Sequence, residues 1–227
     1  MQPINRRSLV DTVVDELRRE ISDGRWAIGD RIPSEAELTT TLGVSRPSIR
    51  EAVRSLVQLG LLETRQGDGT YVVATDPTQV ALRRAIHSAD SHEVIRVRRA
   101  LDALAASEAA ASRTDEQLAE LADYLRARRA AVDAGDASAF AAADVAYHLG
   151  IARASGNQLL ADIYASFDAS LWESVADASC VEQHSDPEGA DMHDALYQAI
   201  AAQDAERATA AALSVLEQQE RLLDELD

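Results

Sequence analysis

The apolar residues near the start of the chain recur at the spacing of amphipathic helices. Two series are long enough to predict a buried helix face, and they comprise Leu9, Val10, Val13, Val14, Leu17 and Ile21, and then Ile49, Val53, Leu56 and Val57. Between them, Ser34 and Glu37 have the spacing of a capping box, which predicts a second, short helix from about 35 to 42. Gly43 ends this helix, and Ser45 is a natural N-cap for the next one. The pattern therefore predicts three helices joined by short turns.

The pattern changes after the third helix. Two short runs of strand-forming residues, 61–65 and 70–73, flank Gln-Gly-Asp-Gly, which is typical of a tight hairpin. Three helices and a two-stranded hairpin predict a winged helix-turn-helix domain over residues 1–75. After a linker expected at 76–79, residues 80–227 carry Ala-rich helical patterns without a strand pattern, so the fold class is mainly α with an all-α second domain. The helices expected there lie near 78–88, 91–112, 115–134, 137–154, 158–178, 189–202 and 204–226.

Charge is distributed unevenly between the two predicted domains. The net charge of the chain is -17, but residues 1–75 contain 10 arginines and 11 acidic residues, whereas the remainder contains 12 and 28. This asymmetry predicts two domains with different partners, of which the first is compatible with DNA. The single cysteine excludes an internal disulfide and a multi-cysteine metal cluster. With neither a leader pattern nor a membrane-spanning apolar run, we expect a cytoplasmic protein with no membrane partner.

The outer face of the third predicted helix is basic. Its outward-facing side chains are Arg46, Arg50, Arg54 and Gln58. A recognition helix presents the side chains of its N-terminal part to base edges in the major groove, and Arg46, Ser48 and Arg50 are placed for this. Arginine can donate two parallel hydrogen bonds to one guanine, which discriminates between bases. Three exposed arginines alone would also fit a solvated surface, so the interpretation depends on the whole motif.

Two further features of the first domain suit DNA. The Ser45 hydroxyl stands at the N-terminus of the third helix, where the helix dipole favours a phosphate. Gln66 and Gly67 occupy the tip of the predicted hairpin, and glycine permits close approach of the backbone to the minor groove.

The predicted helix over 137–154 carries polar residues on its apolar face. Phe140, Asp144, Tyr147, His148 and Ile151 share this face by their spacing. A buried carboxylate needs a cation, a proton or several donors, and Asp144 and His148 at i, i+4 can reach one metal ion. A histidine on an apolar face is more commonly a hydrogen-bonded core residue, and this alternative stays open.

Two other segments carry similar residues. His193 lies on an apolar face with Leu196, Tyr197 and Ile200, and is a third candidate metal ligand. Arg98 falls on or beside the apolar stripe of its helix, where it needs an anion. That anion is either the carboxylate of a bound small molecule or an acid of the chain itself.

The first domain resembles the GntR-type winged helix. The resemblance is carried by Gly-Asp-Arg-Ile-Pro-Ser-Glu, Gly-Val-Ser-Arg, Arg-Glu-Ala and Gly-Asp-Gly-Thr, in this order and spacing. It implies a bacterial transcription regulator that binds a palindromic double-stranded DNA operator as a homodimer. The residues at the matching DNA-contact positions are Ser45, Arg46, Ser48, Arg50, Gln66 and Gly67. Ala36 departs from the family pattern, because many members have arginine there.

The second domain resembles the helical effector domain of the FadR-like branch, called FCD. The matching segments are EVIRVRRALDALAA, DVAYHLGIARASGN and MHDALYQAIAAQDAERATAAALSVL. The resemblance implies a divalent ion of the zinc, nickel or manganese type, held by one aspartate and three histidines, and a bound organic acid. Asp144, His148 and His193 match three of these ligands, whereas Val215 stands at the fourth position and cannot ligate.

Together these features predict a ligand-responsive regulator, expected to be a repressor. Arg98, Asn157 and Tyr197 are the candidate effector-binding residues, and Asn157 also suits capping of the helix that follows it. One alternative is a metal-free sensor of acyl-type ligands with the same architecture. Another is an enzyme, because two histidines and one carboxylate also describe a non-haem iron site. The enzyme is disfavoured, since no acid or base with a clear role stands nearby and an enzyme does not need a DNA-reading module.

Overall fold

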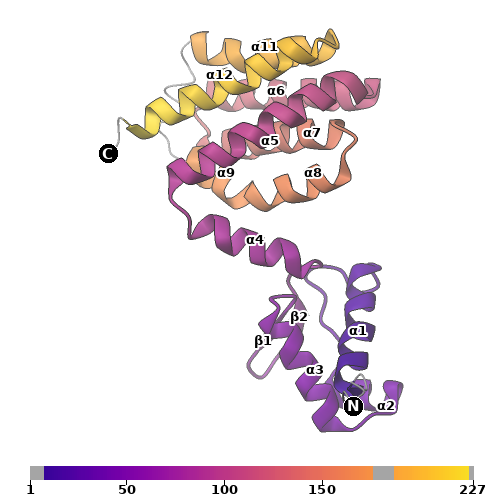
Figure 1. The fold of residues 1–227 in the computed structure, drawn as a ribbon. Helices are drawn as coiled ribbons and strands as arrows, with labels where there is room; N and C mark the ends of the chain where they lie inside the picture. The colour runs from indigo at the N-terminus through magenta and orange to yellow at the C-terminus, as the bar shows by residue number, and fades with distance from the viewer. Residues whose placement is uncertain (1–7, 176–186, 225–227) are drawn as a thin grey trace, which may run out of the picture. The chain divides into compact units, whose positions relative to one another are not determined.

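The chain forms two compact units in the computed structural model, residues 1–81 and 82–227, and the structure describes residues 8–175 and 187–224 (Figure 1). The first unit contains α1 (Leu9–Ser22), α2 (Glu35–Leu42), α3 (Arg46–Gln58), β1 (Leu62–Arg65) and β2 (Gly69–Val72). The two strands pair antiparallel, with Leu62 opposite Val72 and Arg65 opposite Gly69. This arrangement confirms the predicted winged helix-turn-helix.

Local side-chain chemistry sets the ends of the helices in the first unit. Ser34 and Glu37 form the predicted capping box at the start of α2, and Ser45 caps α3 through the Ser48 amide at 3.4 Å. Gly43 ends α2 in the left-handed conformation with φ 66°, which glycine adopts without strain. The turn between α2 and α3 is therefore encoded by the residues at its two edges.

One apolar core holds the first unit together. Its buried residues come from all three helices and both strands, and they are Val13, Leu17, Ile21, Ile32, Leu38, Ile49, Ala52, Val53, Leu56, Leu61, Leu62 and Val72. Ile49 and Leu56 of α3 have no exposed surface, which fixes the rotation of α3 about its axis. The opposite face of α3 consequently points to solvent.

The residues expected as a linker, 76–79, coincide with the start of α4 (Pro77–His87). The connection therefore begins as helix, and proline suits this position because its missing N–H is not needed in a first turn. Leu82 and Ile86 of α4 pack on the core of the second unit.

The second unit is all-helical in the part of the chain that the structure describes. It comprises α5 (Ser91–Ser112), α6 (Asp115–Ala134), α7 (Ala137–Ala154), α8 (Gln158–Tyr164), α9 (Asp168–Val175), α11 (Pro187–Ala201) and α12 (Ala205–Asp224). Helix α7 packs against α5, α6, α8 and α9 and is buried over most of its length. Buried alanines such as Ala106 and Ala110 of α5 let the helices approach closely. Among the described helices, none has the length and apolar run required to cross a membrane.

The single helix expected at 158–178 is wrong. The structure divides this segment into α8, a 3-10 turn at Ala165–Phe167 and α9, and residues 176–178 lie outside the described part. At the start of α9, the carboxylate of Asp168 accepts a hydrogen bond from the Ala169 amide at 2.7 Å. Tyr164 and Phe167 on either side of the turn are both buried. Apolar spacing alone does not reveal such a break, because it is preserved across the turn.

Candidate functional site

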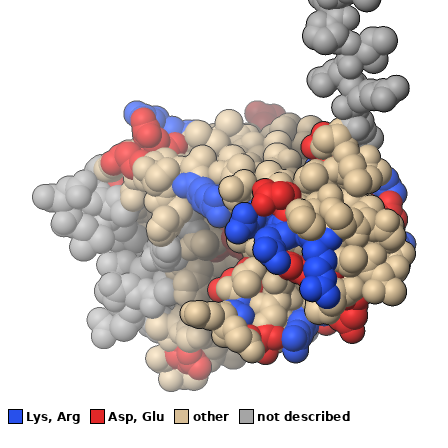
Figure 2. Space-filling view, turned by 90° about the horizontal axis from the view of Figure 1, so that it is seen from below, with Lys and Arg blue, Asp and Glu red and all other residues tan. Residues whose placement is uncertain are grey.

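The basic face of α3 is exposed as predicted. Arg46, Arg50 and Arg54 lie opposite the buried residues of the helix and are exposed to solvent. In Figure 2 basic side chains gather on the face shown, with acidic side chains among them. The face shown in Figure 2 therefore carries both positive and negative side chains and is not a uniformly basic patch.

Acidic neighbours hold two of these arginines. Glu35 of α2 accepts hydrogen bonds from Nε and Nη2 of Arg50, both at 3.3 Å, and Glu51 accepts one from Arg54 at 2.9 Å. Such exposed ion pairs are weak, typically about 0.2 to 1 kcal/mol. A phosphate or a base edge can therefore displace the carboxylate from either arginine.

The remaining predicted contacts of the first unit lie at the N-terminus of α3 and at the wing. The Ser45 and Ser48 hydroxyls are 2.9 Å apart, so the cap and its neighbour form one polar pair. Gln66 and Gly67 are exposed between the two strands, and Gly67 has φ 77°, which an L side chain rarely adopts. The guanidinium carbon of Arg65 lies 4.2 Å from the centre of the Tyr71 ring, a cation–π contact between the two strands of the wing.

The polar residues predicted on α7 and α11 meet in the interior of the second unit. Asp144, His148 and His193 are 4%, 7% and 3% exposed, and each offers a ligand atom within 4.8 Å of the others. Nε2 of His193 lies 3.4 Å from Oδ1 of Asp144, and Nε2 of His148 lies 3.8 Å from Oδ2. The Tyr147 hydroxyl donates to the backbone carbonyl of His193 at 3.1 Å and ties α7 to α11. These three residues bring together donor atoms of the kinds that ligate metal ions.

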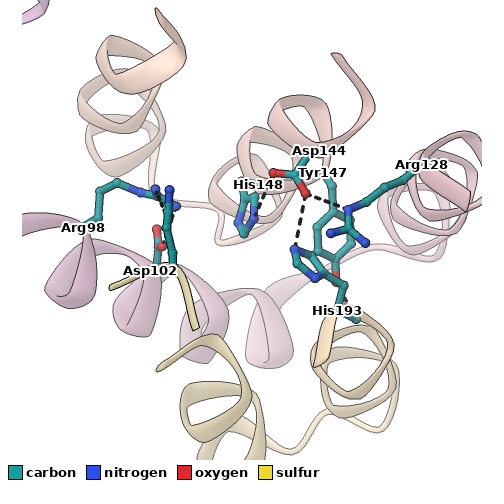
Figure 3. A network of polar contacts seen from close by, with 8 residues as sticks. Arg98, Asp102, Arg128, Asp144, Tyr147, His148 and His193 are labelled. Carbon is teal, nitrogen blue, oxygen red and sulfur yellow. Dashed lines mark hydrogen bonds and ion pairs between the residues drawn. The ribbon is translucent and has the colours of Figure 1, made fainter. Parts of the chain in front are cut away.

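A fourth residue, Arg128 of α6, belongs to this group and was not among the predicted site residues. Its Nε donates to Oδ1 of Asp144 at 2.7 Å, and Figure 3 shows Arg128, His148 and His193 around the carboxylate of Asp144. Arg128 is only 4% exposed and lies over the Phe140 ring at 4.6 Å. A sequence signal for it existed, because Arg128 falls on the same helical stripe as Leu121 and Leu125, which are both buried.

Protonation in this group follows from burial and charge. Burial alone would raise the pKa of Asp144, but His148, Arg128 and His193 together hold the pKa of its carboxyl well below its ordinary value. Burial lowers the pKa of His148 and outweighs the attraction of Asp144 and Asp102 for its charged form. At neutral pH we therefore expect a charged Asp144 facing a permanently charged Arg128 and a neutral His148.

Arg98 of α5 has an acidic partner inside the protein. Its Nη2 lies 3.3 Å from Oδ2 of Asp102, and its Nη1 donates to Gln219 of α12 at 2.9 Å. Figure 3 shows this pair on the other side of His148 from Arg128. Of the two partners that the sequence left open for Arg98, an acid of the chain is present.

A small cavity is lined by Asp102 of one buried ion pair and by His148, which lies beside the other pair. Its lining comprises Asp102, Ala105, Ala106, His148, Ile151, Tyr164, Leu196 and Ala212, and its volume is about 10 Å³, room for about one water molecule. Burial raises the pKa of Tyr164 well above its ordinary value, so this lining residue carries a neutral hydroxyl. The predicted effector residues Arg98, Asn157 and Tyr197 are absent from this lining.

Asn157 and Tyr197 have other surroundings. The Asn157 side chain accepts a hydrogen bond from the Leu160 amide at 3.2 Å, so it caps α8, and its amide donates to Glu108 at 3.3 Å. Tyr197 is half-buried and packs against the apolar core. Both residues therefore have a structural role in the described state.

Comparison with known proteins supplies the family. The model described as "Bacterial regulatory proteins, gntR family" matches residues 9–72, and the FCD domain model matches residues 93–218. The chain belongs to the GntR family. Its second unit is an FCD domain, and the resemblance noted in both parts of the sequence is confirmed.

Relatives of this GntR-family protein are regulators. It is 31% identical over 211 residues to the HTH-type transcriptional regulator LutR of Bacillus subtilis, covering 89% of this chain and 95% of LutR. It is 28% identical over 170 residues to the HTH-type transcriptional repressor NanR of Salmonella newport, covering 72% and 65%. A solved structure of a Streptococcus agalactiae GntR protein matches 94% of this chain and 99% of its own, with 28% identity and a TM-score of 0.67. The chain is thus a DNA-binding transcriptional regulator and not an enzyme.

Proposed function

We propose that this GntR-family regulator binds a palindromic operator as a homodimer and represses transcription until a small organic acid binds in its FCD unit. The observation that carries the DNA-binding part is the exposed basic face of α3 beside an exposed wing tip. Repression is supported by the printed name of the relative NanR. A dimer is supported by geometry, since two recognition helices placed about one DNA turn apart read a two-fold symmetric site.

In this proposal α3 reads bases and the residues around it hold phosphates. Arg46 and Arg50 are exposed near the N-terminus of α3, where bidentate contacts to guanine are worth about 1 to 3 kcal/mol of discrimination. Ser45, Ser48 and Arg54 contact the backbone, and Gln66 and Gly67 approach the minor groove. These roles predict different consequences of substitution, because phosphate contacts are shared by all DNA sequences.

The effector in this proposal is a carboxylate that enters the FCD unit near the small cavity. A cavity of about 10 Å³ is too small for an organic acid, so binding requires the helices around it to move. A ligand that binds only one arrangement of the helices shifts the population toward that arrangement. Arg98, held by Asp102 and Gln219, is the cation placed to exchange an internal partner for the effector carboxylate.

Two versions of this proposal differ in the charge that balances Asp144. In the first, Asp144, His148 and His193 hold a divalent ion of the zinc, nickel or manganese type. This version is supported by their nitrogen and oxygen atoms, which are donors that such ions accept. Such an ion would supply a Lewis acid to which an effector carboxylate could bind. In the second, the chain supplies the cation itself through Arg128, and the sensor is metal-free.

Substitution of Arg50 by alanine tests the DNA-reading role. The specific DNA is the site upstream of the protein's own gene that the wild-type protein protects in a footprint. We expect Arg50→Ala to weaken binding to this site by about 5- to 150-fold, the equivalent of one bidentate base contact. Binding to scrambled DNA should fall only a few-fold, because one positive charge is lost. Fluorescence anisotropy at a fixed salt concentration measures both affinities.

The control for this experiment is Arg25→Ala. Arg25 is an exposed arginine of the same unit that pairs with Glu20 at 2.8 Å, so its removal changes the charge equally without altering α3 or the wing. Equal losses on both DNAs for Arg50→Ala would contradict base reading, and the absence of any protected site would contradict the operator itself.

A further inference from the structure

The negative charge of Asp144 is buried in the interior of the second unit, where it needs a positive charge beside it. The side chain of Asp144 is 6% exposed and is surrounded by helices of the second unit. Removing a carboxylate from water costs several kcal/mol unless an opposite charge and hydrogen bonds replace the solvent. The cation beside Asp144 therefore determines whether the interior of this unit is stable.

That cation is present in the chain. The Nε atom of Arg128 contacts Oδ1 of Asp144 at 2.7 Å, whereas the histidine nitrogens are farther from the carboxylate, at 3.4 and 3.8 Å. Arg128 is as buried as Asp144, and its guanidinium is fixed between the carboxylate and the Phe140 ring at 4.6 Å. A guanidinium carries a positive charge and five N–H donors, so it can both neutralise a carboxylate and bond to it.

A divalent ion does not fit beside this pair. Asp144 and Arg128 already cancel in charge, so an ion between Asp144, His148 and His193 would leave two uncompensated positive charges in the interior. It would also lie within a few ångströms of the guanidinium, where like charges repel strongly because little water screens them. On α12, the buried residue at the position that resembles a fourth ligand is Val215, whose aliphatic side chain cannot bind an ion.

We infer that Arg128 is the resident cation of this site and that this FCD unit is stable and functional without a divalent ion. The guanidinium neutralises Asp144 and orients its carboxylate, and His148 and His193 serve as polar core residues beside it. This inference concerns the pocket of the proposed effector, but it rests on the ion pair alone and requires neither an operator nor a DNA-binding activity.

Metal binding by untagged protein tests this inference directly. Wild-type protein is stripped with EDTA, incubated with Zn²⁺, Ni²⁺ or Mn²⁺ in turn, dialysed, and assayed for bound metal by mass spectrometry and for affinity by calorimetry. We expect that wild-type protein binds none of these ions in stoichiometric amount at this site. Its melting temperature should be the same with and without EDTA. Arg128→Leu removes the positive charge and should raise the affinity for at least one of these ions by at least about 10-fold.

Two controls separate the charge of Arg128 from its position. Arg129→Leu removes the same charge one residue away, from an arginine that is 54% exposed and paired with Asp194, and it should leave metal binding unchanged. Arg128→Lys keeps the charge and should also exclude the ion.

The outcomes are distinguishable even if Arg128→Leu does not fold. A wild-type protein that retains one tightly bound ion and loses thermal stability in EDTA overturns the inference, and so does an Arg128→Lys protein that binds metal as Arg128→Leu does. Either result would leave the proposed regulator intact in its metal-binding version. Conversely, a protein that binds no operator but resists EDTA would contradict the proposed function and support the role of Arg128.

Discussion

At the scale of single residues, acids of the same unit restrain two of the arginines that we propose contact DNA, Arg50 and Arg54. Glu35 is 41% exposed in its side chain and pairs with Arg50 across the turn between α2 and α3. The carboxylate has two opposite effects, because it positions the guanidinium but also repels phosphates. Its net effect on DNA binding can be measured.

We expect Glu35→Gln to strengthen binding to any DNA by a few-fold, because an exposed ion pair of about 0.2 to 1 kcal/mol is lost together with a negative charge near the phosphates. Glu20→Gln is the matched control, since Glu20 pairs with Arg25 away from α3. Anisotropy titrations of both variants on the same duplex make the comparison. Weaker binding by Glu35→Gln would show that positioning of Arg50 dominates.

Three of the four residues in the buried polar group of the second unit could be predicted from the sequence, and the fourth, Arg128, was not. The spacing of Asp144, His148 and His193 on apolar faces is sufficient to place them inside the bundle, and the structure brings them together. Spacing also predicts that Asp144 needs a cation, and the stripe of Leu121 and Leu125 favours Arg128 among the arginines of α6, but spacing does not show that this arginine reaches Asp144. The packing of α6 on α7 brings Arg128 to Asp144, whereas Arg126 and Arg129 are exposed.

At the scale of elements, the ends of the helices were the most predictable features, because they depend on local chemistry. Ser34 and Glu37 exchange hydrogen bonds within four residues of chain, with the Ser34 amide 2.8 Å from Oε2 of Glu37. The break between α8 and α9 was missed because it depends on how Tyr164 and Phe167 are buried against distant helices. Local motifs are visible in a sequence, whereas tertiary packing is not.

The capping box of α2 gives a stability prediction for the winged-helix unit. We expect Ser34→Ala to lower its free energy of unfolding by about 1 kcal/mol, because helix N–H groups lose their acceptor. Ser22→Ala is the control, since the Ser22 hydroxyl donates to the Arg19 carbonyl of its own helix. The chain has two tryptophans, and Trp26 packs on the core of the first unit, so urea unfolding followed by fluorescence in a Trp172→Phe background reports this unit. Equal midpoints for both variants would show that the cap contributes nothing measurable.

At the scale of the whole molecule, one chain joins a DNA-reading unit of nearly balanced charge to a strongly acidic FCD unit. Residues 1–75 carry 10 basic and 11 acidic residues, while the remaining residues carry 12 and 28. This division was readable from composition, and the two compact units agree with it. The excess of acidic residues makes the second unit repel DNA, so we expect the first unit to contact the operator.

Coupling between the two units predicts a reciprocal effect. A carboxylic acid identified by thermal shift that weakens operator binding by some factor must itself bind the operator complex more weakly by the same factor, typically about 5- to 150-fold. Calorimetric titration of the acid into free protein and into the protein–DNA complex measures this factor. If the acid binds both forms equally, its effect on transcription does not pass through the FCD unit of this chain.

The pairing of Arg50 with Glu35 and of Arg54 with Glu51 also affects how ionic strength acts on the regulator. A protein that neutralises phosphates releases about 0.9 condensed counterions for each one, and this release makes binding sensitive to salt. An arginine that leaves a carboxylate for a phosphate exposes that carboxylate, which attracts a small cation from solution in return. The release of counterions from the DNA and the uptake of cations by the carboxylates then largely cancel. The affinity for DNA should therefore fall less steeply with added salt than the number of arginines on α3 would suggest.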